Sequence, residues 1–298
     1  MRYNSDFDDY TKRSDETGRI GGEANAKKSM ISKAIMIAIH AVILLLTYFP
    51  MYFMLISSLK NNDQISANCF LPTFPLRFEN YSAAFFHVVR YLGNSIIVSG
   101  GAVIGIMICG SMSAYIFARY KFPGKNVLYI LILSFLMVPA VLTLIPQFVL
   151  VNNLGLNNTY WSCILPYIAT GQIIFIVILR TFIEEIPKDL FDAARIDGAG
   201  NARIFMQVVF PLSKQIIVSL LLINFLNTWN DFVWPQLTLT KDALKTVTVG
   251  LFAFTDAQQI QYGNMFAGFV IASVPLIILF SVNMKSFVSG ITIGAVKG

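Results

Sequence analysis

The sequence predicts an all-α membrane protein with six transmembrane helices, and two observations support this fold class. Of its 298 residues, 56% are hydrophobic and 13% are charged, whereas a soluble domain has about 25% charged residues. Six apolar runs each contain about 20 residues, enough to cross a hydrocarbon layer about 30 Å thick as a helix. Backbone groups in lipid must be bonded within their own segment, so helices are predicted, and the alternating segments of a membrane barrel are not seen.

The six predicted spans follow one another with connections of variable length. Pro139 and Pro146 fall inside the third span and should bend it. Such bends either serve helix packing or act as hinges around a translocation path. In the second span, Gly101 and Gly105 permit close helix contact. The spans are Ala34–Ile56, Ile96–Ala118, Val127–Val151, Tyr160–Leu179, Val208–Trp229 and Met265–Met284.

The first 29 residues are predicted to form a cytoplasmic tail, and residues 30–298 the transmembrane domain. The tail is polar and carries both signs of charge. The apolar run after it is longer than the 7–15 residues of a signal-peptide core, so it reads as an uncleaved membrane anchor.

Lys and Arg are distributed asymmetrically across the predicted membrane. The side that holds both termini carries 17 of the 22 basic residues. The positive-inside rule therefore predicts that both termini are cytoplasmic. The bias also explains the net charge of +6, and no basic stripe with stacking aromatic residues suggests a nucleic-acid partner.

Two external connections are long enough to hold short helices. The connection around 60–92 is expected to carry a helix near Tyr81–Val89, and the connection around 238–263 a helix near Thr246–Asp256. The cytoplasmic connection Arg119–Lys125 is predicted as a tight basic turn, because it contains Pro-Gly.

The cytoplasmic connection at about 184–211 has more internal structure than a simple loop needs. Asp189 is a plausible N-cap, and Asp192 three residues later approximates a capping box. A helix of about two turns is expected over Leu190–Asp197, and Gly198 stands where a left-handed residue would end it. A second helix then leads back into the membrane.

This short helix has the character of a plug for a protein groove. Leu190 and Phe191 are expected to form an apolar knob, Ala193 and Ala194 a flat face, and Arg195 and Asp197 the rim. The alternative is a helix lying on lipid, but such helices are basic and broadly apolar on one face.

A polar and aromatic cluster follows the fifth span near its external end. Two interpretations stay open: an aromatic belt at the membrane interface, or an external gate or sugar-stacking surface on the substrate path. The residues are Asn227, Trp229, Asn230, Asp231 and Trp234.

The sequence predicts no catalytic residue, no metal site and no bound cofactor. It contains no metal-ligand spacing, nucleophile elbow or phosphate-binding loop, so ATP would have to be bound by another protein. The three cysteines show no pair spacing that implies a disulfide framework.

Several motifs, in order, give the chain a resemblance to a known family over about residues 30–298. The segment Asp192-Ala-Ala-x-x-x-Gly198-x(5)-Ile204-x(6)-Pro211 resembles the EAA motif of bacterial ABC importer permeases. The segments 118–124, 154–160, 227–235 and 290–298 resemble the carbohydrate branch of maltose-transporter type, and its shorter second permease in particular. The first EAA position is Asp192 where the family usually has Glu.

The resemblance implies a permease subunit in the bacterial cytoplasmic membrane. Its implied partners are a homologous permease in a heterodimer, two cytoplasmic ATPase subunits that bind ATP and Mg, an external solute-binding protein and membrane lipid. The 184–211 connection would contain the coupling helix that seats on the ATPase. The implied function is ATP-driven import of a mono-, oligo- or polysaccharide.

Two other functional classes are weaker. An ion-coupled secondary transporter would need ionisable residues near mid-bilayer, and the spans are almost free of charge there. An intramembrane enzyme would need paired catalytic groups, which the sequence does not offer.

Overall fold

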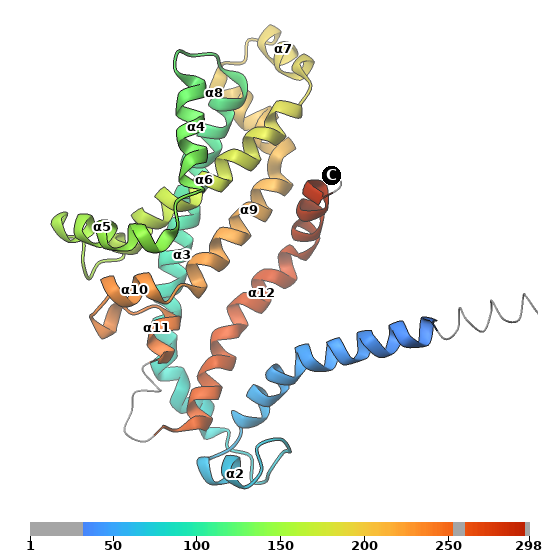
Figure 1. The fold of residues 1–298 in the computed structure, drawn as a ribbon, viewed down its shortest axis with the longest axis vertical. Coiled ribbons are helices and arrows are strands. Elements are labelled where there is room, and N and C mark those ends of the chain that lie inside the picture. The colour runs from blue at the N-terminus through green and yellow to red at the C-terminus, as the bar shows by residue number, and fades with distance from the viewer. Residues whose placement is uncertain (1–31, 253–259, 296–298) are drawn as a thin grey trace, which may run out of the picture.

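The computed structural model describes residues 32–252 and 260–295, and there its regular elements are all helices (Figure 1). Five helices are long and apolar enough to cross a membrane, and a sixth span results when the bent pair α4–α5 is counted as one. The all-α membrane fold is therefore confirmed. The predicted tail, residues 1–29, lies outside the described part.

The helices follow the predicted order but differ from the predicted spans in length. They are the N-terminal helix Ser32–Ser57, α2 Asn62–Ala67, α3 Glu79–Arg119, α4 Lys125–Phe135, α5 Ala140–Asn153, α6 Trp161–Glu185, α7 Lys188–Ile196, α8 Asn201–Ile204, α9 Phe210–Asn230, α10 Val233–Thr238, α11 Val247–Phe252 and α12 Tyr262–Ala295, with a π-helical turn Phe205–Val209 before α9 and a 3-10 turn Asp242–Leu244.

The long helix α3 is the centre of the fold and packs against α6, α9 and α12. Its 41 residues correspond to about 60 Å. The predicted separate helix at Tyr81–Val89 is wrong, because that stretch is the first part of α3. The predicted helix near Thr246–Asp256 is found as α11 as far as the described residues extend.

Small residues bring α3 close to α6. A Cβ on Gly101 would come 2.9 Å from Cδ1 of Ile164, and a Cβ on Gly105 would come 2.2 Å from Cδ1 of Ile168. The absence of a side chain at these two positions therefore sets the distance between the two helices. The expected close contact at the glycine pair is confirmed.

The third span is broken rather than gently bent. Helices α4 and α5 meet at 103°, and Pro139 stands at the N-cap of α5 with extended backbone, φ −61° and ψ 129°. Proline cannot donate to the preceding turn, and the residue before it avoids helical geometry. Pro146 is different, because α5 continues through it.

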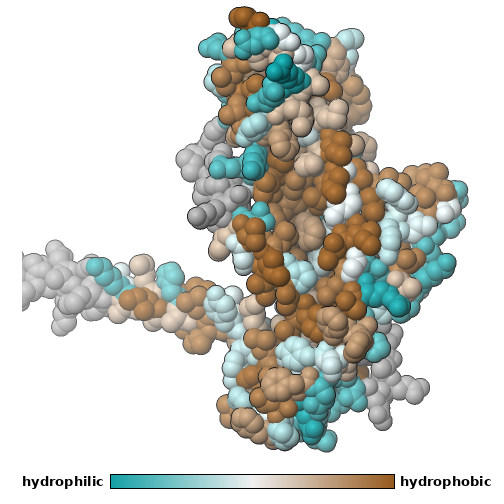
Figure 2. Space-filling model, turned by 180° about the vertical axis from the view of Figure 1, so that it is seen from behind, coloured by the Kyte–Doolittle hydropathy of each residue, from teal (hydrophilic) through white to brown (hydrophobic). Residues whose placement is uncertain are grey.

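The N-terminal helix extends away from the other helices (Figures 1 and 2). None of its most apolar window is buried within the chain, and Leu45 is 71% exposed. Near its C-terminal end, the ring of Phe53 lies 5.5 Å from the ring of Phe266, edge to face. Most of its apolar surface is thus left for lipid or another chain to cover.

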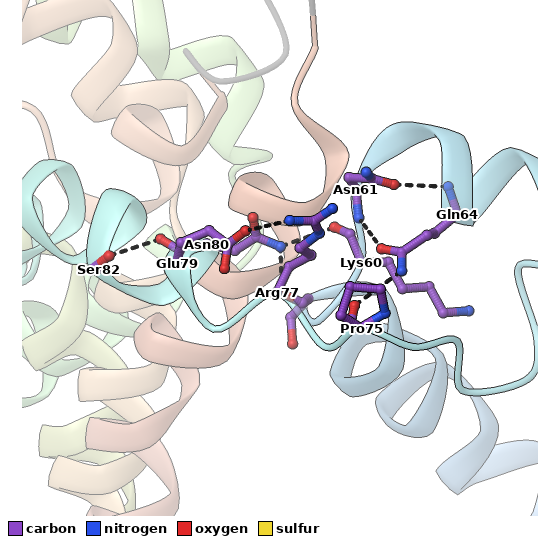
Figure 3. Close-up of polar contacts among 9 residues, drawn as sticks. Lys60, Asn61, Gln64, Pro75, Arg77, Glu79, Asn80 and Ser82 are labelled. Atoms are coloured by element: carbon purple, nitrogen blue, oxygen red, sulfur yellow. Dashed lines mark hydrogen bonds and ion pairs between the residues drawn. The ribbon is translucent and has the colours of Figure 1, made fainter.

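A polar network joins the ends of three helices, the N-terminal helix, α2 and α3, at the end of the molecule that holds α2 (Figure 3). Nδ2 of Asn80 donates to the carbonyl oxygens of Ser58 and Lys60, both at 2.9 Å. The side chains of Asn61 and Gln64 form a capping box at the start of α2. Nζ of Lys60 is buried and donates to the Asn68 carbonyl at 2.8 Å, and burial lowers the pKa of this ammonium group.

Candidate functional site

The segment between α6 and α9 forms a compact docking segment, defined here as residues 184–211, at the opposite end of the molecule from α2 (Figure 1). It contains the short helix α7, a glycine break, the single turn α8 and the π-helical turn that leads into α9. The predicted sequence of helix, break and second helix is confirmed.

The start of α7 differs from the prediction. The N-cap position is Pro187, with extended backbone and no side-chain cap. Asp189 lies inside the first turn, so the predicted N-cap at Asp189 and capping box with Asp192 are wrong. The carboxylate of Asp189 still lies where the helix dipole favours negative charge.

The end of α7 is a complete Schellman motif, as Gly198 predicted. Gly198 has φ +77°, a conformation that favours glycine. Its N–H donates to the carbonyl of Arg195 at 3.0 Å, and the N–H of Ala199 donates to the carbonyl of Ala194 at 2.9 Å. The helix therefore stops at a fixed point, and the chain reverses there.

The two residues of the predicted apolar knob face different surroundings. Phe191 is buried, 4% exposed, whereas Leu190 is 44% exposed. The guanidinium carbon of Arg119 lies 4.0 Å from the centre of the Phe191 ring. The prediction of a joint Leu190–Phe191 knob is therefore wrong: Phe191 anchors α7 to its own chain.

An exposed apolar residue that sequence reasoning missed stands at the end of α7. Ile196 is 86% exposed, although it has one of the larger apolar side chains of the segment. The sequence could have indicated this exposure, because Ile196 lies between the charged residues Arg195 and Asp197 on a short helix. With Leu190 and Ala193, it gives α7 its exposed apolar surface.

The acidic residue of the motif is paired within its own helix. Nη1 of Arg195 lies 3.4 Å from Oδ1 of Asp192, and both side chains are more than half exposed. Such a surface pair contributes about 0–1 kcal/mol. The carboxylate of Asp192 is thus presented to solvent beside a positive charge.

The remaining motif residues belong to the base of the segment. Ala194 is half-buried against the core, and Ile204 is 1% exposed. Pro211 lies in the first turn of α9, where it lacks the N–H that a helix would use four residues back. The π-helical turn directly precedes it, so the chain re-enters the apolar layer through an irregular turn.

A groove of about 800 Å³ runs beside this base, between the C-terminal half of α3 and the start of α9. Its walls are almost entirely apolar, with Lys121 and Asn201 among the few polar residues. Representative lining residues are Met107, Tyr115, Ile116, Phe205, Met206 and Phe210.

Between the two ends of the molecule, at the turn from α9 to α10, Asp231 joins several elements (Figure 1). Oδ1 accepts from the backbone N–H groups of Val233 and Trp234 at 3.0 and 3.4 Å, and Oδ2 accepts from the Tyr167 hydroxyl at 2.8 Å. The Asp231 carbonyl accepts from Oγ1 of Thr248 at 2.8 Å. One residue thus connects α9, α10, α6 and α11.

The aromatic members of the predicted external cluster are buried. Trp229 is 2% exposed and stacks on Phe225 at 5.5 Å. Trp234 is 4% exposed, and its Nε1 donates to the Ser162 carbonyl at 2.9 Å. Neither ring therefore offers an exposed face on which a lipid headgroup or a sugar could stack. Asn227 and Asn230 are exposed.

No metal-binding cluster is found in the part of the chain that the structure describes. No group of three or more His, Cys, Asp or Glu side chains there lies close enough to hold an ion. The geometry instead provides an anchored helix with an exposed face at one end of the molecule, and a set of hydrogen bonds around Asp231 at the turn between α9 and α10.

Comparison with known proteins assigns the chain to a family. Residues 105–292 match the family described as binding-protein-dependent transport system inner membrane component. The chain belongs to this family. It is accordingly a multi-pass membrane subunit of a transporter and not an enzyme.

Relatives of known name align over nearly their full length. The diacetylchitobiose uptake system permease protein NgcG of Streptomyces coelicolor is 32% identical, covering 94% of this chain and 92% of the relative. The arabinooligosaccharides transport system permease protein AraQ of Bacillus subtilis is 31% identical, covering 85% and 92%. The trehalose/maltose transport system permease protein MalG of Thermococcus litoralis is 31% identical, covering 90% and 98%.

Solved structures share the fold. A chain of a bacterial ABC transporter involved in the import of the acidic polysaccharide alginate has a TM-score of 0.75 at 20% identity, covering 91% of this chain and 98% of that chain. This family member therefore has the fold of an ABC importer permease.

Proposed function

We propose that this permease subunit imports a carbohydrate, delivered by an external solute-binding protein and driven by ATP on separate ATPase subunits. Relatives named for transport of diacetylchitobiose, arabinooligosaccharides and trehalose or maltose support the solute class. A similar structure is described as an alginate ABC transporter in complex with an alginate pentasaccharide-bound periplasmic protein, which supports the external partner.

The exposed face of α7 is the observation that carries the mechanism. Leu190, Ala193 and Ile196 are exposed on a helix whose other side is held by buried Phe191 and whose end is fixed at Gly198. A short rigid helix with a small apolar face suits a groove in another protein. The groove belongs to a cytoplasmic ATPase subunit, with Asp192, Arg195 and Asp197 at the rim, and a second ATPase serves a homologous permease partner.

The conformational change of the permease is driven by the ATPase subunits, and this chain carries out no chemical step. When the two ATPase subunits close on ATP and Mg, α7 is displaced, and the helices rock from inward-facing to outward-facing. The ligand shifts this equilibrium only by binding the two states with different affinity. Both termini are cytoplasmic in this arrangement, in the inner membrane of a bacterium.

The external hub at Asp231 is proposed as part of the external gate. Asn227 and Asn230 are exposed beside it and supply amide groups to the substrate path. Trp229, stacked on Phe225, and Trp234, bonded to the Ser162 carbonyl, stabilise the position of these groups.

Crosslinking and uptake test the proposal together. In the reconstituted complex, Ala193→Cys and Ile196→Cys should crosslink to the ATPase, and Cys at Gln215, exposed on α9, should not. Uptake of labelled oligosaccharide into proteoliposomes should require ATP and the solute-binding protein. Uptake driven by an ion gradient alone, or an active complex without either α7 crosslink, would contradict the proposal.

A further inference from the structure

Arg119 is the last residue of α3, and its side chain reaches both segments that flank the turn into α7. Nη2 donates to the carbonyl oxygen of Ile183 at 2.6 Å and also to that of Ile186. These carbonyls belong to the end of α6, where the last turn of a helix lacks its own donors. The same guanidinium covers the ring of Phe191 at 4.0 Å. One side chain thus joins α3, α6 and α7.

A second contact from α3 holds the other side of the glycine break. The ring of Tyr115, one turn before Arg119, lies 5.6 Å from the ring of Phe205. Phe191 precedes Gly198 and Phe205 follows it, so the last turns of α3 touch the docking segment on both sides of its reversal. All of these aromatic rings lie in or against one buried cluster.

We propose that Arg119 is a positioning residue that transmits the displacement of α7 to α3. The proposal rests on the docking of α7 proposed above. A displacement of α7 moves Phe191, and the guanidinium above the ring carries that motion to α3, the helix against which α6, α9 and α12 all pack. Without Arg119, α7 can move while α3 stays behind.

The competing explanation is that Arg119 only caps α6 and stabilises the fold. Arg180 provides a matched control for this explanation. Its guanidinium lies 3.7 Å from the ring centre of Tyr129, and its Nε bonds Oε1 of Glu184 at 2.9 Å. Arg180 therefore makes the same guanidinium–ring contact near the same end of α6, but its hydrogen bond goes to a carboxylate, and it joins α6 to α4 and not to α7.

The test uses the whole complex, with its ATPase and solute-binding protein, in proteoliposomes. For Arg119→Met and Arg180→Met, the ATP hydrolysed per labelled solute imported is measured, together with the Ala193→Cys crosslink to the ATPase. We expect Arg119→Met to keep the crosslink and raise the ATP-to-solute ratio about tenfold, a usual size for coupling between sites. Arg180→Met should leave the ratio unchanged.

Two further variants keep the proposal testable when Arg119→Met does not assemble. Arg119→Lys keeps the charge and one donor group over the ring and should restore most of the coupling, whereas Phe191→Leu should raise the ratio with Arg119 intact. An unchanged ratio in Arg119→Met and Phe191→Leu, or an equal rise in Arg180→Met, would overturn the proposal. Loss of the crosslink in the otherwise native chain would instead contradict the docking of α7.

Discussion

The hydroxyl of Tyr167 donates a 2.8 Å hydrogen bond to Oδ2 of Asp231, which joins the N-terminal part of α6 to the turn between α9 and α10. The other carboxylate oxygen accepts from the first N–H groups of α10. The position of α10 therefore depends on one carboxylate, and this dependence can be measured.

Replacing Asp231 by Asn should loosen the turn. An amide is uncharged and has one acceptor oxygen in place of two, so the Tyr167 hydroxyl must reverse its bond and accept from the amide N–H if the oxygen stays on α10, and the loss of the charged acceptor costs about 1–3 kcal/mol. We expect a lower midpoint of thermal unfolding and reduced import. Tyr167→Phe removes only the α6 contact and should cause a smaller loss. An equal or larger loss in Tyr167→Phe would show that Asp231 is not the hub.

Replacing Gly198 by Ala should weaken the end of α7. An added Cβ meets no atom within 4 Å, so the whole effect comes from the left-handed backbone, about 1–2 kcal/mol for a residue with a side chain. Gly200 has equally open surroundings but φ −72°, and Gly200→Ala is therefore the control. Binding-protein-stimulated ATP hydrolysis should fall in Gly198→Ala and stay near the native rate in Gly200→Ala. Equal rates in the two variants would contradict the backbone argument.

Replacing Gly105 by Ala should separate α3 from α6. The new methyl group would overlap Cδ1 of Ile168, 2.2 Å away, and overpacking of this kind costs about 1–3 kcal/mol. Gly100→Ala, where nothing lies within 4 Å, should be neutral or slightly stabilising. Thermal unfolding in detergent compares the two; an unaffected Gly105→Ala would contradict the overpacking argument and would mean that Ile168 gives way.

Replacing Asp192 by Glu should preserve import. The Asp192 carboxylate is exposed and pairs loosely with Arg195 at 3.4 Å, so the added methylene has room and lengthens its reach. Asp192→Ala should leave thermal stability almost unchanged, because an exposed pair contributes about 0–1 kcal/mol, while lowering stimulated ATP hydrolysis about fivefold. A stability loss equal to that of a core variant would show that the carboxylate serves the fold instead.

Acid should weaken the 3-10 turn that contains Asp242. Burial opposes ionisation of this carboxyl, but hydrogen bonds from Lys245 and Tyr91 outweigh it, so its pKa lies below the ordinary value of 3.8. The carboxylate therefore stabilises the fold fully above the unfolded pKa, and this contribution is lost as the pH falls through the lower, folded pKa. Between about pH 5 and 3, the native chain should lose more stability than Asp242→Asn; parallel curves would contradict this assignment.

Local signals were sufficient for much of the fold and for part of the site. Span hydropathy identified the membrane helices, because burial in lipid constrains composition directly. Gly198 gave the end of α7, since its conformation depends on neighbouring residues alone. The start of α7 was misplaced because Asp189 competes with Pro187, which is equally suited to a helix start.

Orientation toward distant residues could not be read from sequence. Phe191 faces inward because Arg119, far away along the chain, lies over its ring. Trp234 is buried because α6 presents the Ser162 carbonyl to its Nε1. The length of α3 was underestimated for another reason: hydropathy marks where a helix lies in lipid, and α3 continues beyond its most apolar part.

The break at Pro139 also tells how the subunit must sit among its neighbours. α5 begins without a side-chain cap, but the N–H of Leu142 donates to the Pro139 carbonyl at 3.0 Å. The side chains around this corner are apolar and exposed, with Met137 84% and Val141 75% exposed, so lipid or another chain has to cover them. The sharp angle between two short helices thus determines which apolar surface the subunit offers to its surroundings.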